Sequence, residues 1–197
     1  TRYMKSFFLN DPKMLIYGFM IIFFGSYGQT FFIALFNDDI KNYYSLTDGQ
    51  FGLIYALSTT LSSLLLINVA KLIDFIDLRI YSIIITTGLI ITCISIYILP
   101  FNIFYLVIII LSLRFFGQGA MTHAGITSLT RYFGKDRGKA ISFGNLGGML
   151  GVMFLPIIVV YFKNFFSFRE IWLFSSISLV IFLPILYIIL NNQKQRQ

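Results

Sequence analysis

Six apolar stretches, each long enough to cross a bilayer, occupy nearly the whole of this chain. They are residues 14–36, 51–70, 80–99, 103–129, 140–162 and 171–190. A helix rises about 1.5 Å per residue, so about 20 apolar residues match a hydrocarbon layer of about 30 Å. Within lipid, backbone amides and carbonyls must pair inside their own segment, which favours helices. The sequence therefore predicts an all-α polytopic membrane protein with six transmembrane helices.

The rest of the chain consists of two short tails and five connections. We expect residues 1–13 to be a cytoplasmic N-terminal tail and residues 14–190 to form one bundle. Residues 191–197 would be a cytoplasmic tail or the start of a linker. A hydrophobic content of 57% and a charged content of 12% are typical of a membrane protein and leave no space for a soluble domain. The first residue is Thr rather than Met, so we expect a fragment of a longer protein.

The basic residues are divided unevenly between the two sets of connections. If the N-terminus is cytoplasmic, eleven Lys and Arg residues lie inside, and only Lys41, Lys163 and Arg169 lie outside. Membrane proteins concentrate positive charge in their cytoplasmic loops. We therefore predict that both termini are cytoplasmic, in a plasma membrane of the bacterial inner-membrane type. The net charge of +7 then reflects orientation, and we expect membrane lipid rather than nucleic acid as a partner.

The chain offers no group of residues suited to catalysis or metal binding. It has one histidine, one cysteine and no carboxylate inside the apolar stretches. Metal sites need clustered His, Cys or carboxylate ligands, and enzymes need a nucleophile or acid–base pair. We therefore expect no enzymatic activity, no metal and no cofactor.

Arg114 is the most informative polar residue, because it lies near the middle of residues 103–129. A charge at the bilayer centre costs at least about 2.5–3.5 kcal/mol, so Arg114 should face a cavity or a partner. Gln118 follows one helical turn later, and Gly117 shares that face. A guanidinium beside an amide suits a carboxylate. The alternative is that Arg114 satisfies helix carbonyls or anchors the bundle.

His123 is a second candidate on the same stretch. It follows Arg114 by nine residues, a rotation of about 180° on an ideal helix. Both can face one cavity only if the helix is interrupted, which Gly117 and Gly119 could permit. Because the unperturbed pKa of a histidine side chain lies near 6.5, a histidine at position 123 could relay protons. Alternatively, it is a buried histidine bonded to a neighbouring Thr or Ser.

Further polar residues lie within other stretches. Around Gly25 the first stretch has a polar midsection, in which Tyr27 and Gln29 are expected to line a cavity. Asn145 is expected to make a hydrogen bond between helices. Residues 58–63 of the second stretch are rich in Ser and Thr.

The fifth stretch carries a dense glycine pattern, Gly144, Gly147, Gly148 and Gly151. These residues form two small-xxx-small pairs, which allow another backbone to approach closely. The pattern is consistent with ordinary helix packing and with helices that slide past each other during a conformational cycle. Both interpretations can hold.

Three segments resemble motifs of the major facilitator superfamily. Residues 70–79 resemble its signature loop, G-x-L-x-D-x-x-G-x-[RK], with Leu72, Asp74 and Arg79 at matching positions, although Ala70 and Asp77 replace the glycines. Residues 114–119 resemble the R-x-x-x-x-G motif of its fourth helix. Residues 131–140, with the glycine-rich stretch after them, are similar to its monocarboxylate and oxalate/formate branch.

The resemblance implies the N-terminal half of a twelve-helix transporter, built as a 3+3 inverted repeat that binds solute near the midplane. Leu72, Asp74 and Arg79 would form a cytoplasmic latch, and spans 1 and 4 would line the cavity. The substrate or coupling residues would be Arg114, Gln118, His123, Tyr27 and Gln29.

We therefore expect secondary active transport of a small organic anion, such as a mono- or dicarboxylate, by alternating access. The protein partner would be the missing C-terminal half or a second copy. The alternative is a self-contained six-helix protein that acts as a homodimeric half-size carrier or channel.

Overall fold

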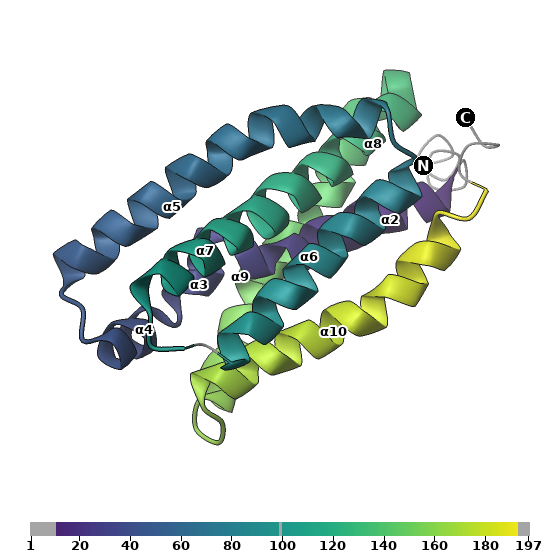
Figure 1. The fold of residues 1–197 in the computed structure, drawn as a ribbon. Helices are drawn as coiled ribbons and strands as arrows, with labels where there is room; N and C mark the ends of the chain where they lie inside the picture. Colours follow the sequence, from purple (N-terminus) through teal and green to yellow (C-terminus); the bar gives the residue numbers. More distant parts are fainter. Residues whose placement is uncertain (1–10, 99, 193–197) are drawn as a thin grey trace.

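The computed structural model describes residues 11–98 and 100–192, and these residues form helices joined by short turns (Figure 1). The α-helices are α2 (Pro12–Gly25), α3 (Thr30–Ala34), α4 (Asn37–Tyr44), α5 (Asp48–Val69), α6 (Leu78–Ile98), α7 (Ile103–Leu113), α8 (Thr122–Phe133), α9 (Arg137–Phe162) and α10 (Phe168–Ile189). The segments with other helical turns are η1 (Ser26–Gly28), η2 (Ala70–Asp74), η3 (Arg114–Met121) and η4 (Gly134–Asp136). The all-α prediction is confirmed. Of the two predicted tails, residues 1–10 and 193–197 lie outside the described residues.

Five helical segments are long and apolar enough to cross a membrane. They are Pro12–Ala34, Asp48–Asp74, Leu78–Ile98, Ile103–Phe162 and Phe168–Ile189. The fourth is 60 residues long and contains a reversal at Gly134, whose φ of 42° lies in the left-handed region that favours glycine. After this reversal α9 runs parallel to α2, because Gly147 lies beside Phe19 and Gly151 beside Ser26.

The helices extend beyond the apolar stretches that predicted them. α5 and α10 each begin with a capping box, in which Thr47 and Ser167 accept hydrogen bonds from the amides of Gln50 and Glu170. The predicted loop over residues 130–139 is mostly helical, and only η4 separates α8 from α9. The predicted loop over residues 37–50 contains α4. Polar first and last turns make good helix ends, but hydropathy does not detect them.

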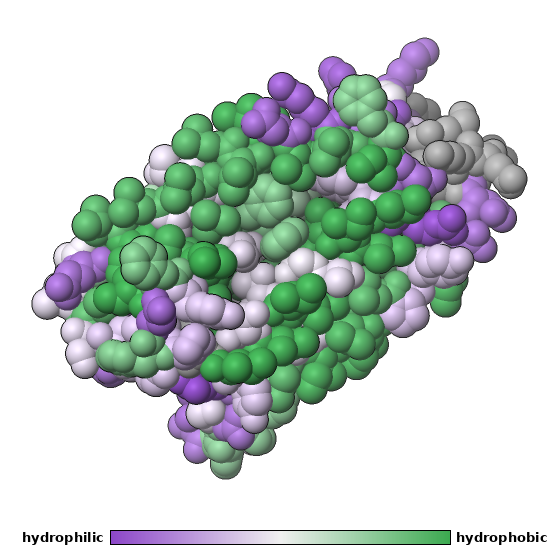
Figure 2. All heavy atoms as spheres, in the orientation of Figure 1, coloured by the Kyte–Doolittle hydropathy of each residue, from purple (hydrophilic) through white to green (hydrophobic). Residues whose placement is uncertain are grey.

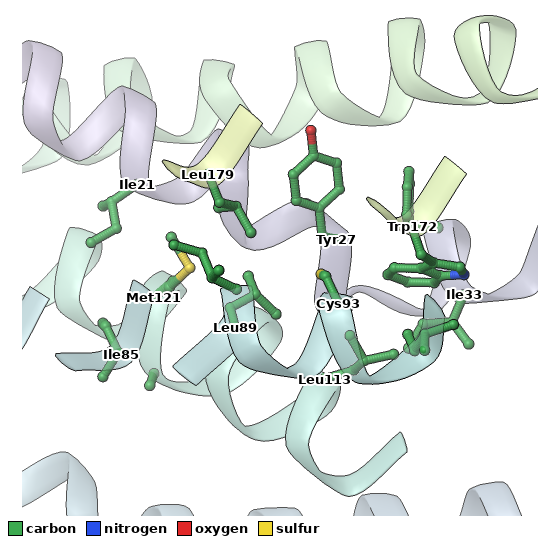
Figure 3. Packing of buried hydrophobic residues seen from close by; sticks show 14 of the residues in the cluster. Ile21, Tyr27, Ile33, Ile85, Leu89, Cys93, Leu113, Met121, Trp172 and Leu179 are labelled. Carbon is green, nitrogen blue, oxygen red and sulfur yellow. The ribbon is translucent and has the colours of Figure 1, made fainter. Parts of the chain in front are cut away.

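The helices pack in three main groups: α6 with α10, α2 with α8 and α9, and α5 with α7 and η3. Buried side chains of α2, α6, α10 and the α7–η3 region meet in the core (Figure 3). There Trp172 packs edge-on against Phe32, with ring centroids 5.1 Å apart. α5 lies at the periphery. In the most apolar 18-residue stretch of Asp48–Asp74 only 11% of the residues are buried, against 56% in that of Pro12–Ala34.

Polar groups gather at the two ends of the bundle, and apolar side chains cover its middle (Figure 2). At one end Tyr132 donates a hydrogen bond of 2.5 Å to Asp11, and the Arg79 guanidinium lies over the Tyr187 ring. The first and last described residues therefore share this end. At the other end Lys163 pairs with Asp39 at 2.5 Å.

Candidate functional site

The first helical segment breaks at its middle, where the sequence has its glycines and polar residues. α2 gives way to η1, and Gln29 is extended with a ψ of 152°. The amides of Phe32 and Ile33 both donate to the carbonyl of Gln29. The carbonyl of Gly28 instead accepts a bond of 3.4 Å from Nη1 of Arg114. The break therefore provides a backbone acceptor for the buried arginine.

Two glycines bring η1 and η3 into backbone contact. A Cβ on Gly28 would lie 2.0 Å from the carbonyl oxygen of Leu113, and one on Gly117 would lie 2.6 Å from Cα of Gly28. No side chain fits at either position. Gly117, predicted as a hinge or packing residue, is thus placed at a close helix–helix contact.

η3 is a π-helical stretch of eight residues that begins at Arg114. Its wider i→i+5 turns rotate each residue by less than the roughly 100° of an α-helix. The stretch therefore changes the phase between Arg114 and His123, which an ideal helix would place on opposite faces. Both residues border the same pocket, and the helix is widened there rather than interrupted.

Arg114 is 9% exposed and is held by neutral groups. Its Nη1 donates to Oγ1 of Thr30 at 2.9 Å, and its guanidinium lies 5.6 Å from the centre of the Tyr55 ring. None of the ion pairs among the described residues includes Arg114. Its Nε is buried without a hydrogen-bond partner. The bundle thus contains a buried cation with one donor unused.

A first pocket of about 330 Å³ lies between α5 and the η3–α8 segment. Its lining residues are Thr59, Ser62, Ser63, Leu66, Arg114, Gln118, Gly119, Thr122, His123 and Ile126. Four buried polar atoms here lack a partner: Nε of Arg114, Oε1 of Gln118 and the hydroxyls of Thr59 and Thr122. The sequence pointed to the arginine and the glutamine. It noted Thr59 only as part of the Ser- and Thr-rich residues 58–63, and it did not single out Thr122, because an isolated Thr in an apolar helix carries no distinguishing signal.

A second pocket of about 510 Å³ lies between the α2–η1 segment and α9. Its polar lining residues are Ser26, Gln29, Thr122 and Asn145. Thr122 borders both pockets. The expected interhelical hydrogen bond of Asn145 is not found among the described residues, and its side chain borders this pocket instead.

Tyr27 is placed differently from the prediction that it lines a cavity. It is 6% exposed and packs in the core against Phe32, with ring centroids 5.0 Å apart (Figure 3). Its hydroxyl pairs with Oγ of Ser178 at 2.8 Å. It borders neither pocket, because the short η1 turn directs the ring toward α10.

His123 is half-buried, and its ring nitrogens lie 3.4 and 3.5 Å from Oγ1 of Thr127. The contact to a neighbouring Thr fits one of its two interpretations, and its place in the first pocket fits the other. Its role stays a prediction. Within residues 11–98 and 100–192, no three His, Cys, Asp or Glu side chains are grouped as metal ligands.

The predicted latch residues do not pair with one another. Asp74 forms an ion pair with Arg131 at the end of α8. Arg79 stacks on Tyr187 of α10, and its amide donates to Oδ1 of Asp77 at 2.8 Å. The Asp that replaces a motif glycine therefore caps α6. Leu72 is 41% exposed on η2.

Two glycines of α9, Gly147 and Gly151, lie at a close contact with the α2–η1 segment. A Cβ on Gly147 would lie 2.1 Å from the carbonyl oxygen of Phe19, and one on Gly151 would lie 2.3 Å from Oγ of Ser26. Gly144 faces Leu129 of α8, and Gly148 faces α2. Gly119 lies against Leu66 of α5.

A family model of the major facilitator superfamily matches residues 15–197. The chain therefore belongs to this superfamily of membrane transporters, and it is an integral membrane protein. The match is to the superfamily and does not select the monocarboxylate and oxalate/formate branch. Comparisons with curated proteins and with solved structures found no match.

Proposed function

We propose that the chain is the N-terminal half of a secondary transporter that carries a small organic anion by alternating access. The observation that supports this most is the buried guanidinium of Arg114, which has an unused donor and no carboxylate partner among the described residues. An unsatisfied buried polar group costs about 1–3 kcal/mol. A ligand carboxylate would supply acceptors to Arg114 and to the two threonine hydroxyls. Gln118 would contact the same ligand.

The helix packing supports a six-span, 3+3 arrangement. We assign Ile103–Phe162 to two spans, because 60 residues of helix would be about 90 Å long, three times the hydrocarbon thickness. The main packing groups then join span 1 to spans 4 and 5, span 2 to span 4, and span 3 to span 6. An axis that exchanges spans 1–3 with spans 4–6 maps this pairing onto itself. The two pockets, between spans 2 and 4 and between spans 1 and 5, are related in the same way.

The partner that we propose is a C-terminal six-helix half, bound across the faces that carry the pockets. α9 presents Met149 and Val152 there, which line the second pocket and are more than half exposed. A second copy of the chain, as in a homodimeric carrier or channel, would use the same faces. If the full-length protein formed a homodimer in detergent, that alternative would be favoured.

The anion site is tested by Arg114→Lys and Arg114→Gln in the full-length transporter. Lys keeps the charge but loses the planar fork that bonds Thr30 and a carboxylate together, so we expect markedly weaker uptake. We expect Gln to abolish uptake, with folded protein still in the membrane. The measurement is anion uptake per folded molecule in reconstituted vesicles.

Arg169→Gln is the matched control. Arg169 stacks on Tyr43 at the end of the bundle that contains α4, and it borders neither pocket. It should leave uptake unchanged. Normal uptake by Arg114→Gln would end the anion-site proposal. Loss of folded protein in both Arg114 variants, with normal uptake by the remainder, would make Arg114 a structural anchor.

The orientation is tested by cysteine labelling. Lys135 lies in η4, and Lys41 lies in α4 at the other end of the bundle. The native Cys93 is fully buried and should not react. We expect Lys41→Cys to label from outside the cell and Lys135→Cys only after permeabilisation, as cytoplasmic termini and a bacterial inner membrane require. Labelling of both from one side would refute the six-span topology.

A further inference from the structure

The two pockets differ in charge but share one residue. The first contains the permanent cation, Arg114, whereas the polar residues of the second are neutral. Thr122 borders both, and its hydroxyl is buried without a partner. Because Thr122 borders both pockets, they adjoin, and an elongated molecule is the kind of ligand that would occupy both. Volumes of about 330 and 510 Å³ are within the range known for small-molecule sites.

The second pocket offers hydrogen-bonding capacity that is not used within the protein. The side chains of Gln29 and Asn145 are half-buried and bond to no other described group. An amide presents both donors and an acceptor, which is also what a hydroxyl needs. Ser26 and Thr122 add hydroxyls to the same wall.

This chemistry discriminates between three kinds of ligand tail. A second carboxylate would lose water without meeting a cation on this side of the site, which is costly. A purely alkyl tail would leave the two amides unpaired as water is excluded. A hydroxylated tail can donate to the amide oxygens and accept from the amide nitrogens, so it satisfies both residues.

We propose, resting on the anion-transport function above, that the solute is a hydroxylated monocarboxylate of the sugar-acid type. Its single carboxylate binds Arg114 in the first pocket. Its hydroxyl-bearing tail lies in the second pocket, against Gln29 and Asn145. This narrows the expected mono- or dicarboxylate to a singly charged acid with a polar tail.

The test uses four six-carbon probes with the purified full-length transporter: gluconate, hexanoate, adipate and glucose. Binding is measured as the ligand-induced rise in Tm over a concentration series, because a ligand that binds only the folded state raises Tm with its concentration. We expect gluconate to bind most tightly, hexanoate and adipate at least about tenfold more weakly, and glucose not at all.

Variants separate the two ends of the ligand. Asn145→Leu and Gln29→Leu should each weaken gluconate binding roughly fivefold to tenfold, as expected for one lost hydrogen bond, and leave hexanoate binding unchanged. Asn42→Leu, on the exposed face of α4, is the matched control and should change neither. Arg114→Gln should remove binding of all three acids.

The outcomes distinguish the two proposals. If adipate or hexanoate binds as tightly as gluconate and still depends on Arg114, the hydroxylated tail is refuted and the anion site stands. The same holds if the Leu variants weaken gluconate and hexanoate equally. If none of the acids binds, or if binding survives Arg114→Gln, both proposals fall.

Discussion

The contact between α2 and α9 differs from the contact of α5 with η3 and α8 in how closely the helices approach. In the first pair Gly147 meets the backbone of α2 directly. In the second pair the residue between the helices is Leu66, which lies against Gly119, and the polar pocket opens beside it. In the most apolar stretch of the α5–η2 segment only 11% of the residues are buried.

The difference agrees with the rule that small residues let membrane helices approach closely. Lipid is as apolar as Leu, so helices gain little by burying Leu and Ile against each other. Close packing depends on whether a side chain separates the backbones. Gly147 brings α2 and α9 into contact where it faces backbone, and a pocket remains beside that contact, as it does between α5 and the η3–α8 segment, where larger side chains separate the helices.

The largest expected effect on stability is at the contact between α2 and α9. Gly147→Ala would place a Cβ 2.1 Å from the carbonyl oxygen of Phe19, so α2 and α9 must separate. Overpacking of this kind costs about 1–3 kcal/mol, and a clash with backbone relaxes poorly. We expect a marked fall in Tm in detergent. Gly52→Ala is the control, because its Cβ would meet nothing within 4 Å and Ala favours helix. If the two variants had the same Tm, the α2–α9 contact would not determine stability.

A smaller effect on stability is expected at the contact between α5 and η3. Gly119→Ala would place a Cβ 2.9 Å from Cδ2 of Leu66, the flexible end of a side chain that can move. We expect a fall in Tm well below that of Gly147→Ala, together with weaker anion binding as Leu66 shifts toward the pocket. The same variant should be compared in Tm and in uptake. If Gly119→Ala lowered Tm more than Gly147→Ala, the contrast between the α2–α9 contact and the α5–η3 contact would be refuted.

The smallest effect on stability is expected at Asp74, in the η2 segment that follows α5. Asp74→Asn removes the ion pair with Arg131, whose side chains are 45% and 51% exposed, so the stability change should stay below about 1 kcal/mol. A latch role instead predicts reduced uptake, because the variant shifts the conformational equilibrium. Asp136→Asn, which removes an exposed pair with Lys139, is the control. Uptake at the parental rate by Asp74→Asn would refute the latch.

From the sequence alone came the helical class, which the structure confirms, and two predictions: close packing at Gly144–Gly151 and a functional role for Arg114. Each rests on a strong local constraint: the length of apolar stretches, the absence of side chains, and the cost of a charge in lipid. Helix ends were predicted less well, because capping residues such as Thr47 and Ser167 are polar and lie outside the apolar windows.

Only the tertiary structure decided which polar residues share a pocket. Arg114 and His123 come together because π-helical turns change the phase along η3, and Thr59 joins them from a distant part of the chain. Tyr27 instead turns into the core, because the break at η1 aims it at Ser178. Periodicity along one helix assumes regular turns and carries no information about neighbouring helices. The phase changes and the contacts between helices come from packing, so a single stretch of sequence could not specify them.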